Sequence, residues 1–259
     1  MFSILKLIGP SQSQYGFPPL GSFINATPEL PVTDQLVGSY FLRNSPDRLK
    51  NYADPSKPLT LVGSPSAADT FSWANLSNHY DTRLIPPKDW TVIAISSIGN
   101  NNTSDGGLDV SNYGDNGATP PILSGDSIGA NNTGSNTTLY ANVLNGSELS
   151  IKSVNVSYPV GTQFQLYAGV FQNAPAFKKI DAISGGITSY PVDMADRTRV
   201  ASLARTLKIG GHHRTGILTG NRRISFVAVY FKVLSDAEIK QIGDYLRLNW
   251  CPAVGILLS

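Results

Sequence analysis

The sequence contains one cysteine, Cys251, among 259 residues. A single cysteine excludes a disulfide within the chain, although such bonds are common in small secreted domains. This favours folding in a reducing cytoplasm. We also expect no signal peptide, because the apolar stretch at residues 1–8 is short and Lys6 interrupts it.

Charged residues are also scarce. They make up 15% of the chain, against about 25% in typical soluble domains. Serine, threonine, asparagine and glycine must therefore cover much of the surface, as in many extracellular and virion β-proteins. The net charge of +2 gives no sign of a nucleic-acid binder, and no apolar run approaches the roughly 18 residues of a membrane span. We expect neither nucleic-acid binding nor membrane insertion.

Glutamate is rare enough to bear on catalysis. Glycoside hydrolysis needs two carboxylates at a defined separation, but Glu29, Glu148 and Glu238 are the only glutamates and no strand carries a carboxylate pair on one face. Residues 166–172 resemble a strand of jelly-roll alginate lyases, but Tyr167 stands where those enzymes have lysine. The companion strands of that family are missing. The sequence therefore predicts no catalytic residues, with a polysaccharide lyase or glycoside hydrolase as the alternative.

Three histidines, His79, His212 and His213, are the remaining candidates for metal binding. Adjacent histidines on a strand point to opposite faces, so we interpret His212 and His213 as part of a surface turn. Cys251 fits a small buried apolar side chain. We expect no metal and no cofactor, while calcium remains an open alternative for the loops described below.

Residues 224–246 show the clearest change of periodicity in the chain. Up to residue 233 both faces of a strand are apolar, which predicts a strand covered on both sides. Ser235 and Glu238 then form a capping box, which predicts a helix at 235–247. One face of this strand is expected to carry Ile224, Phe226, Ala228 and Tyr230.

A buried last strand that leads into a short capped helix resembles the C-terminal signature of laminin-G-like, concanavalin A-like jelly-roll domains. The resemblance rests on the order LKIGG at 207–211, a turn, Gly220-Asn221, the strand and LSDAEI at 234–239. It implies an all-β chain that folds as one antiparallel jelly-roll β-sandwich with a short C-terminal helix.

Further strands follow from alternating apolar residues. Asn145-Gly146 is a strong hairpin signal, and it predicts a hairpin of 138–144 with 149–157. A second hairpin is expected through Gly185-Gly186. The other predicted strands cover residues 36–42, 59–62, 90–97, 163–172 and 200–209.

Residues 100–136 are rich in asparagine, aspartate and glycine and have little apolar pattern. One interpretation is a turn-rich excursion with short irregular strands. The other is a rim that faces a ligand, where Asp and Asn side chains bind sugar hydroxyls or calcium and exposed aromatic rings stack on sugars. The candidate glycan-binding residues are Asp109, Asn112, Tyr113, Asp115, Trp73, Tyr80 and Tyr190. For Trp73 and Tyr80, packing in the core or at an edge is the alternative.

The two ends of the chain carry apolar runs outside the predicted sandwich. We divide the chain into an extended arm at 1–31, the laminin-G-like sandwich at 32–250 and an apolar tail at 251–259. Each run either packs on its own domain or binds a neighbour through an open strand edge. The predicted assembly contacts are Phe2, Ile4, Leu5, Leu7, Ile8, Ile256, Leu257 and Leu258.

These features predict a non-catalytic structural or binding protein with a lectin-like, carbohydrate-binding sandwich. The uncharged surface and the apolar ends resemble those of bacteriophage virion components, such as tail adhesins and capsid decoration proteins. That setting implies other virion proteins, copies of this chain and a host-surface glycan as partners, and synthesis in the host cytoplasm. A lectin-like module acting alone is the alternative.

Overall fold

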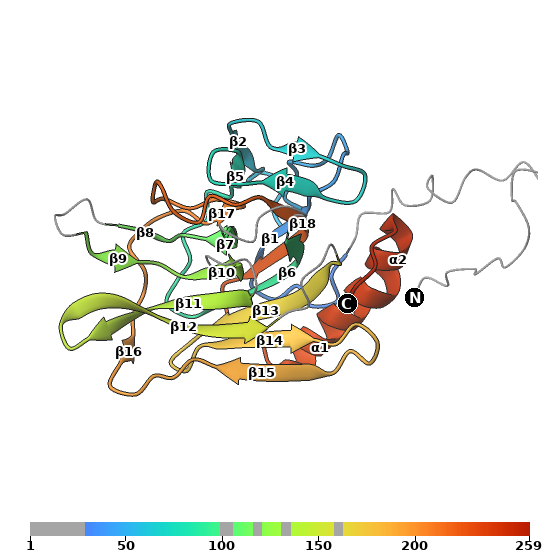
Figure 1. Ribbon diagram of the computed structural model, residues 1–259. Helices are drawn as coiled ribbons and strands as arrows, with labels where there is room; N and C mark the ends of the chain where they lie inside the picture. The colour runs from blue at the N-terminus through green and yellow to red at the C-terminus, as the bar shows by residue number, and fades with distance from the viewer. Residues whose placement is uncertain (1–28, 99–105, 116–120, 131–135, 158–162) are drawn as a thin grey trace, which may run out of the picture.

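The computed structural model describes residues 29–98, 106–115, 121–130, 136–157 and 163–259. Two antiparallel sheets face each other, and a helical segment near the C-terminus lies beside the sandwich (Figure 1). Every pairing between the named strands is antiparallel. The prediction of an all-β jelly-roll sandwich with one short C-terminal helical region is confirmed.

The first sheet is built around β18 (Arg222–Tyr230), which pairs with β1 (Leu36–Phe41), β6 and β4. Its strand order is β15 (Ile187–Pro191), β14 (Ala176–Ile180), β13 (Gln165–Phe171), β6 (Trp90–Ile98), β18, β4 (Ser72–Ala74) and β3 (Ser66–Ala67).

The second sheet contains the long hairpin and several short strands. β16 (Thr198–Arg199) pairs with β11, and β8 (Gly114–Asp115) and β9 (Leu123–Ser124) form a separate two-stranded ribbon. The strand order is β12 (Glu148–Ser157), β11 (Asn136–Asn145), β10 (Ser127–Ala130), β7 (Leu108–Ser111), β17 (Lys208–Ile209), β5 (His79–Asp81) and β2 (Thr60–Val62).

Both faces of β18 are buried, as the sequence predicts. The assignment of faces is wrong for Ile224, however. A register shift between Ile224 and Phe226 in the pairing with β6 marks a β-bulge at Ser225. A bulge inserts one extra residue and reverses the alternation. Ile224 therefore packs between the sheets with Val227, while Phe226 faces the other way.

The outer face of the first sheet is covered by the C-terminal helical segment. α1 (Asp236–Tyr245) begins with the predicted capping box of Ser235 and Glu238, and a π-helical turn (Leu246–Trp250) and α2 (Cys251–Val254) follow. Apolar residues of these helices form a second core with the outer faces of β6, β13 and β18. In the described part of the chain, no helix is long and apolar enough to cross a membrane.

Most strand predictions are confirmed, and one is wrong. The Asn145-Gly146 hairpin forms with residues 136–145 paired to 148–157, and the second hairpin pairs β14 with β15. Of the strand predicted at 200–209, only Lys208–Ile209 pairs. The rest of this segment is irregular, and Leu203 is 38% exposed because it does not reach the core.

Candidate functional site

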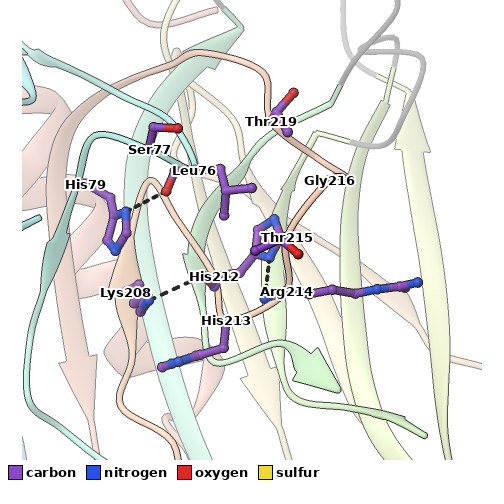
Figure 2. A pocket seen from close by; sticks show the side chains of 10 residues that line it. All are labelled: Leu76, Ser77, His79, Lys208, His212, His213, Arg214, Thr215, Gly216 and Thr219. Carbon is purple, nitrogen blue, oxygen red and sulfur yellow. Dashed lines mark hydrogen bonds between the residues drawn. The ribbon is translucent and has the colours of Figure 1, made fainter. Parts of the chain in front are cut away.

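A pocket of about 550 Å³ opens where the turn between β4 and β5 meets the loop between β17 and β18. Figure 2 shows side chains from both segments around the same space. These segments are far apart in the sequence and are brought together by the β5–β17 pairing. The pocket is lined by Leu76, Ser77, His79, Lys208, His212, His213, Arg214, Thr215, Gly216 and Thr219.

Two glycines after β17 allow this close approach. Gly210 has a φ of +83°, and a Cβ there would lie 2.1 Å from the Cβ of Ala74. A Cβ on Gly211 would lie 2.5 Å from the Cγ atom of the His79 ring. Only glycine fits such a conformation and spacing without strain. The Gly-Gly pair therefore sets the position of His79 in the pocket wall.

All the histidines of the chain line this pocket. His212 is buried, and both of its ring nitrogens are used: Nε2 donates to the Ile217 carbonyl at 3.0 Å, and Nδ1 accepts the Arg214 backbone N–H at 3.2 Å. Nε2 of His213 donates to the Thr206 carbonyl at 2.8 Å. The bonds of His212 select one neutral tautomer, because a protonated ring cannot accept at Nδ1.

His79 has one ring nitrogen that is buried and without a hydrogen-bond partner in the described part of the chain. Its Nδ1 donates to the Leu76 carbonyl at 2.9 Å, so Nε2 is the acceptor of the neutral ring. Among the described residues, Nε2 has no hydrogen-bond partner, although the residue is only 3% exposed. A buried polar atom without a partner is uncommon and often marks a site that a ligand or water completes.

Burial keeps these imidazoles uncharged at neutral pH. It lowers the pKa of His79 and His213, and it lowers the pKa of His212 to about 4. The charge of Lys208 lowers the pKa of each ring further. The pocket therefore combines three neutral rings with the lysine ammonium.

Lys208 is half-buried, and burial lowers its pKa. Its Nζ donates to the His212 carbonyl at 3.3 Å. Asp81 is the residue opposite Lys208 in the β5–β17 pair, but the Asp81 carboxylate accepts hydrogen bonds from Arg83 and Thr206. Among the ion pairs of the described residues, Lys208 has no carboxylate within 4.0 Å.

Arg214 lies at the border of the pocket, and its side chain points away from Lys208 (Figure 2). Its Nη1 donates to the Tyr113 hydroxyl at 2.9 Å, and its Nε lies 3.8 Å from the Asp115 carboxylate. The Tyr113 ring also packs edge-on against His212, with ring centres 5.7 Å apart. Two of the predicted glycan-binding residues, Tyr113 and Asp115, therefore adjoin the pocket.

The other two candidates from residues 100–136 lie inside the sandwich, which corrects the expectation of an exposed rim. Asp109 is fully buried, and its carboxylate pairs with Arg222. Asn112 is also fully buried, and its Oδ1 accepts the Asp126 backbone N–H at 2.7 Å. The described part of this segment supplies the short buried strands β7 and β10, and partners elsewhere in the chain, such as Arg222 for Asp109 and Ser202 for Asn112, satisfy its polar side chains.

The predicted aromatic residues do not line the pocket either. Tyr80 is fully buried in the core between the sheets. Trp73 is half-buried, and the Arg223 guanidinium lies 5.7 Å from its ring centre. Tyr190 packs edge-on against Phe177, 6.3 Å between centres. For Trp73 and Tyr80, the alternative of packing at an edge or in the core describes the observed positions.

The structure describes only some of the predicted assembly contacts. Phe2, Ile4, Leu5, Leu7 and Ile8 lie outside the described residues. At the other end, Ile256 is buried in the second core, and the Phe164 carbonyl accepts the Ser259 backbone N–H at 2.9 Å. Leu257 is 79% exposed and Leu258 is half-buried. The tail thus packs on its own domain, and Leu257 alone among these three side chains points largely to solvent.

The lining of the pocket limits its chemistry. None of the described residues that line it is an aspartate or glutamate, so it holds no carboxylate pair for glycoside hydrolysis. Nor does any described group of three or more His, Cys, Asp or Glu side chains have the geometry to hold a metal ion. The arrangement offers hydrogen bonds, imidazole faces and a positive charge to a small polar ligand.

Sequence reasoning missed this site because it placed His212 and His213 in a surface turn. The useful signal was the Gly-Gly-His-His run after β17, which suggests a tightly packed loop. The role of His79 could not be inferred in the same way. It depends on the pairing of β5 with β17, which joins segments more than a hundred residues apart.

Comparison with known proteins places this architecture among β-sandwich domains. No family model matches the chain, and no curated protein sequence matches it. Trypanosoma rangeli sialidase in complex with sialic acid is similar over 84% of this chain and 34% of its own, with 10% identity and a TM-score of 0.56.

Binding domains of botulinum neurotoxin DC are also similar. The structure in complex with SialylT matches 83% of this chain and 52% of its own, with 11% identity and a TM-score of 0.53. The structure in complex with rat synaptotagmin II matches the same shares, with 12% identity and a TM-score of 0.54.

These likenesses show the fold alone. The chain spans about a third of the sialidase and about half of each toxin chain. The likeness agrees with the predicted β-sandwich fold. The neighbours include an enzyme as well as binding domains, and fold does not by itself assign catalysis.

Proposed function

We propose that this chain is a non-catalytic carbohydrate-binding module and that the histidine pocket is its binding site. The observation that carries the proposal is the pocket itself. Its volume of about 550 Å³ lies within the range of small-molecule sites. Its lining includes Lys208 and also His79, whose Nε2 has no hydrogen-bond partner among the described residues.

Hydroxyl groups at the pocket mouth suit a sugar. Ser77, Thr215 and Thr219 are exposed there and carry hydroxyls that can both donate and accept hydrogen bonds. Sugars carry several hydroxyls with the same chemistry around the ring. The structural neighbours support this assignment, since one was solved with sialic acid and another with SialylT.

Binding without turnover is favoured over the enzymatic alternative by the lining residues. A retaining or inverting glycosidase needs an acid and a second carboxylate, and some sialidases use a tyrosine nucleophile. The described lining contains neither carboxylate nor tyrosine. We therefore expect the protein to bind glycans without releasing reducing or unsaturated ends.

A glycan array tests the proposal with two matched variants. Thr215→Trp places a bulky ring in the exposed loop at the pocket mouth, and Ser189→Trp places the same ring on exposed β15. We expect the unmodified protein and Ser189→Trp to bind a common set of glycans, and Thr215→Trp to lose them. Absence of binding by the unmodified protein, or undiminished binding by Thr215→Trp, would contradict the proposal.

The setting that we propose is a bacteriophage virion, with synthesis in the host cytoplasm. The support for it comes from the sequence: low charge, one cysteine and apolar chain ends. Other virion proteins, copies of this chain and a host-surface glycan would be the partners. Mass spectrometry of purified particles should detect the protein at a fixed copy number. A monomer by light scattering that is absent from particles would indicate a lectin-like module that acts alone.

A further inference from the structure

We propose that the histidine pocket selects sugars that carry a singly charged acidic group, and that Lys208 is the counter-ion of that group. This inference rests on the proposed carbohydrate-binding function and specifies its ligand class. It starts from a lysine that forms no ion pair among the described residues. Lys208 is half-buried, and its Nζ donates to a neutral carbonyl at 3.3 Å.

Other lysines of the chain show what Lys208 lacks. Lys178, Lys232 and Lys240 each lie within 4.0 Å of a carboxylate. Lys208 forms no such pair among the described residues. Removing a charge from water costs free energy unless an opposite charge or good hydrogen bonds replace the water. An anionic group in the pocket would supply the missing interaction.

Burial lowers the pKa of Lys208 more than the charge of Asp81 raises it, and no carboxylate of the described residues lies within 4.0 Å of the Lys208 ammonium. Asp81 is opposite Lys208 on β5, but its oxygens accept hydrogen bonds from the Arg83 backbone N–H at 2.7 Å and from the Thr206 hydroxyl at 3.0 Å. Arg214 turns towards Tyr113 and Asp115 at the border. The described residues that line the pocket therefore include two basic side chains, Lys208 and Arg214, and no acidic one.

His79 gives the pocket a second point of recognition. Its Nε2 is a buried acceptor without a partner among the described residues. A sugar hydroxyl can donate to this atom while an acidic group on the same sugar accepts from Lys208. A chloride or sulfate ion can satisfy Lys208 alone, but it has no hydroxyl for His79. The pair of requirements points to an acidic sugar, with a carboxylate or a sulfate ester as the charged group.

We expect the ligand group to carry one negative charge, because one ammonium, that of Lys208, is available to pair with it. A sugar carboxylate and a sulfate ester each carry one negative charge at neutral pH, which matches Lys208. Both accept hydrogen bonds from an ammonium. Calorimetry can distinguish a carboxylate from a sulfate ester as the bound group. The intact protein is titrated with one set of lactose, 3′-sialyllactose and 3′-sulfolactose, and with a second set of digalactose and digalacturonate.

We expect an acidic sugar in each set to bind at least about tenfold more tightly than the neutral one. Tenfold in Kd corresponds to about 1.4 kcal/mol of binding free energy. Lys208→Met should reduce this ratio to near one, and Lys208→Arg should keep most of it. Lys152→Met removes a lysine charge from β12, which lies at the opposite edge of the second sheet from β5 and β2. This variant should leave the ratio unchanged. Thermal unfolding of each variant shows whether it is folded.

The outcomes separate this inference from the proposed function. Equal binding of neutral and acidic sugars, or an acidic preference that survives in folded Lys208→Met, would overturn the inference while carbohydrate binding stands. Binding of no sugar by the intact protein would overturn both. Loss of the preference in Lys152→Met as well would show a general charge effect and would also overturn the role of Lys208.

Discussion

The carboxylate of Asp109 accepts two hydrogen bonds from the guanidinium of Arg222, at 2.7 Å from Nε and 2.9 Å from Nη2. Both residues are buried, and they join β7 of the second sheet to β18 of the first. The Tyr167 hydroxyl donates to the same carboxylate. This buried pair links the two sheets at the centre of the sandwich.

Breaking one side of this pair should be more damaging than replacing both. Arg222→Met leaves a buried carboxylate unpaired, and we expect it to lower the free energy of unfolding by about 3–5 kcal/mol. The double variant Arg222→Met with Asp109→Leu should recover part of that loss, because no charge remains buried. Urea unfolding measures all three proteins. A double variant less stable than Arg222→Met would contradict this account.

Gly210 should tolerate no side chain, and Gly216 provides its control. Both have positive φ, +83° and +78°. A Cβ at Gly216 meets nothing within 4 Å, but at Gly210 it would lie 2.1 Å from the Cβ of Ala74. Gly216→Ala should therefore cost about 1–2 kcal/mol from backbone strain, and Gly210→Ala about 1–3 kcal/mol more from steric overlap. Equal losses in chemical denaturation would show that the close approach is unimportant.

The buried His212 should make stability depend on pH. Its folded pKa of about 4 is lower than the ordinary value of 6.5, so the unfolded chain binds a proton more readily. Stability should then fall as pH decreases from about 6.5 to about 4, by up to about 3 kcal/mol for this ring. The lowered pKa values of His79 and His213 act in the same direction.

The share of His212 can be isolated with His212→Gln. This variant should show a shallower loss of unfolding free energy between pH 6.5 and pH 4 than the unmodified protein. Urea unfolding at a series of pH values gives both slopes. Identical slopes would mean that His212 keeps an ordinary pKa in the folded protein, contrary to the burial seen here.

The C-terminal tail should contribute to the stability of its own domain. Ile256→Ala removes a side chain that is 4% exposed, and we expect a loss of about 2–5 kcal/mol. Leu257→Ala alters a neighbour that is 79% exposed and should change stability by less than about 0.5 kcal/mol. Thermal unfolding with light scattering also reports assembly. If Ile256→Ala dissociates an oligomer without lowering monomer stability, the tail serves a partner instead.

Local patterns in the sequence predicted the elements that depend on neighbouring residues. The alternation of Leu166 and Tyr167 gave the two faces of β13, and Ser235 with Glu238 gave the start of α1. The bulge at Ser225 was not predictable, because an extra residue in a strand leaves the composition of both faces apolar. Its position depends on the pairing of β18 with β6.

The binding pocket was harder to predict for the same reason. Lys208 and His79 come together only through the β5–β17 pair, and β17 contains just two residues. Asp109 and Asn112 are candidate ligand-binding residues only under the interpretation of residues 100–136 as a rim, and not under that of a turn-rich excursion with short strands. Arg222, which pairs with Asp109, and Ser202, which accepts from Asn112, lie far along the chain, so sequence patterns could not reveal that these polar groups are satisfied inside the sandwich.

The most direct test of glycan binding in this pocket uses the three histidines of the chain, all of which line it. When only the histidine rings are labelled with ¹⁵N, every NMR signal comes from a residue that lines the proposed site. Titration with a glycan selected on the array should shift the His79 signals in a saturable way, and Thr215→Trp should abolish the shift. Glycan binding detected by calorimetry that leaves all three histidine rings unchanged would contradict the account.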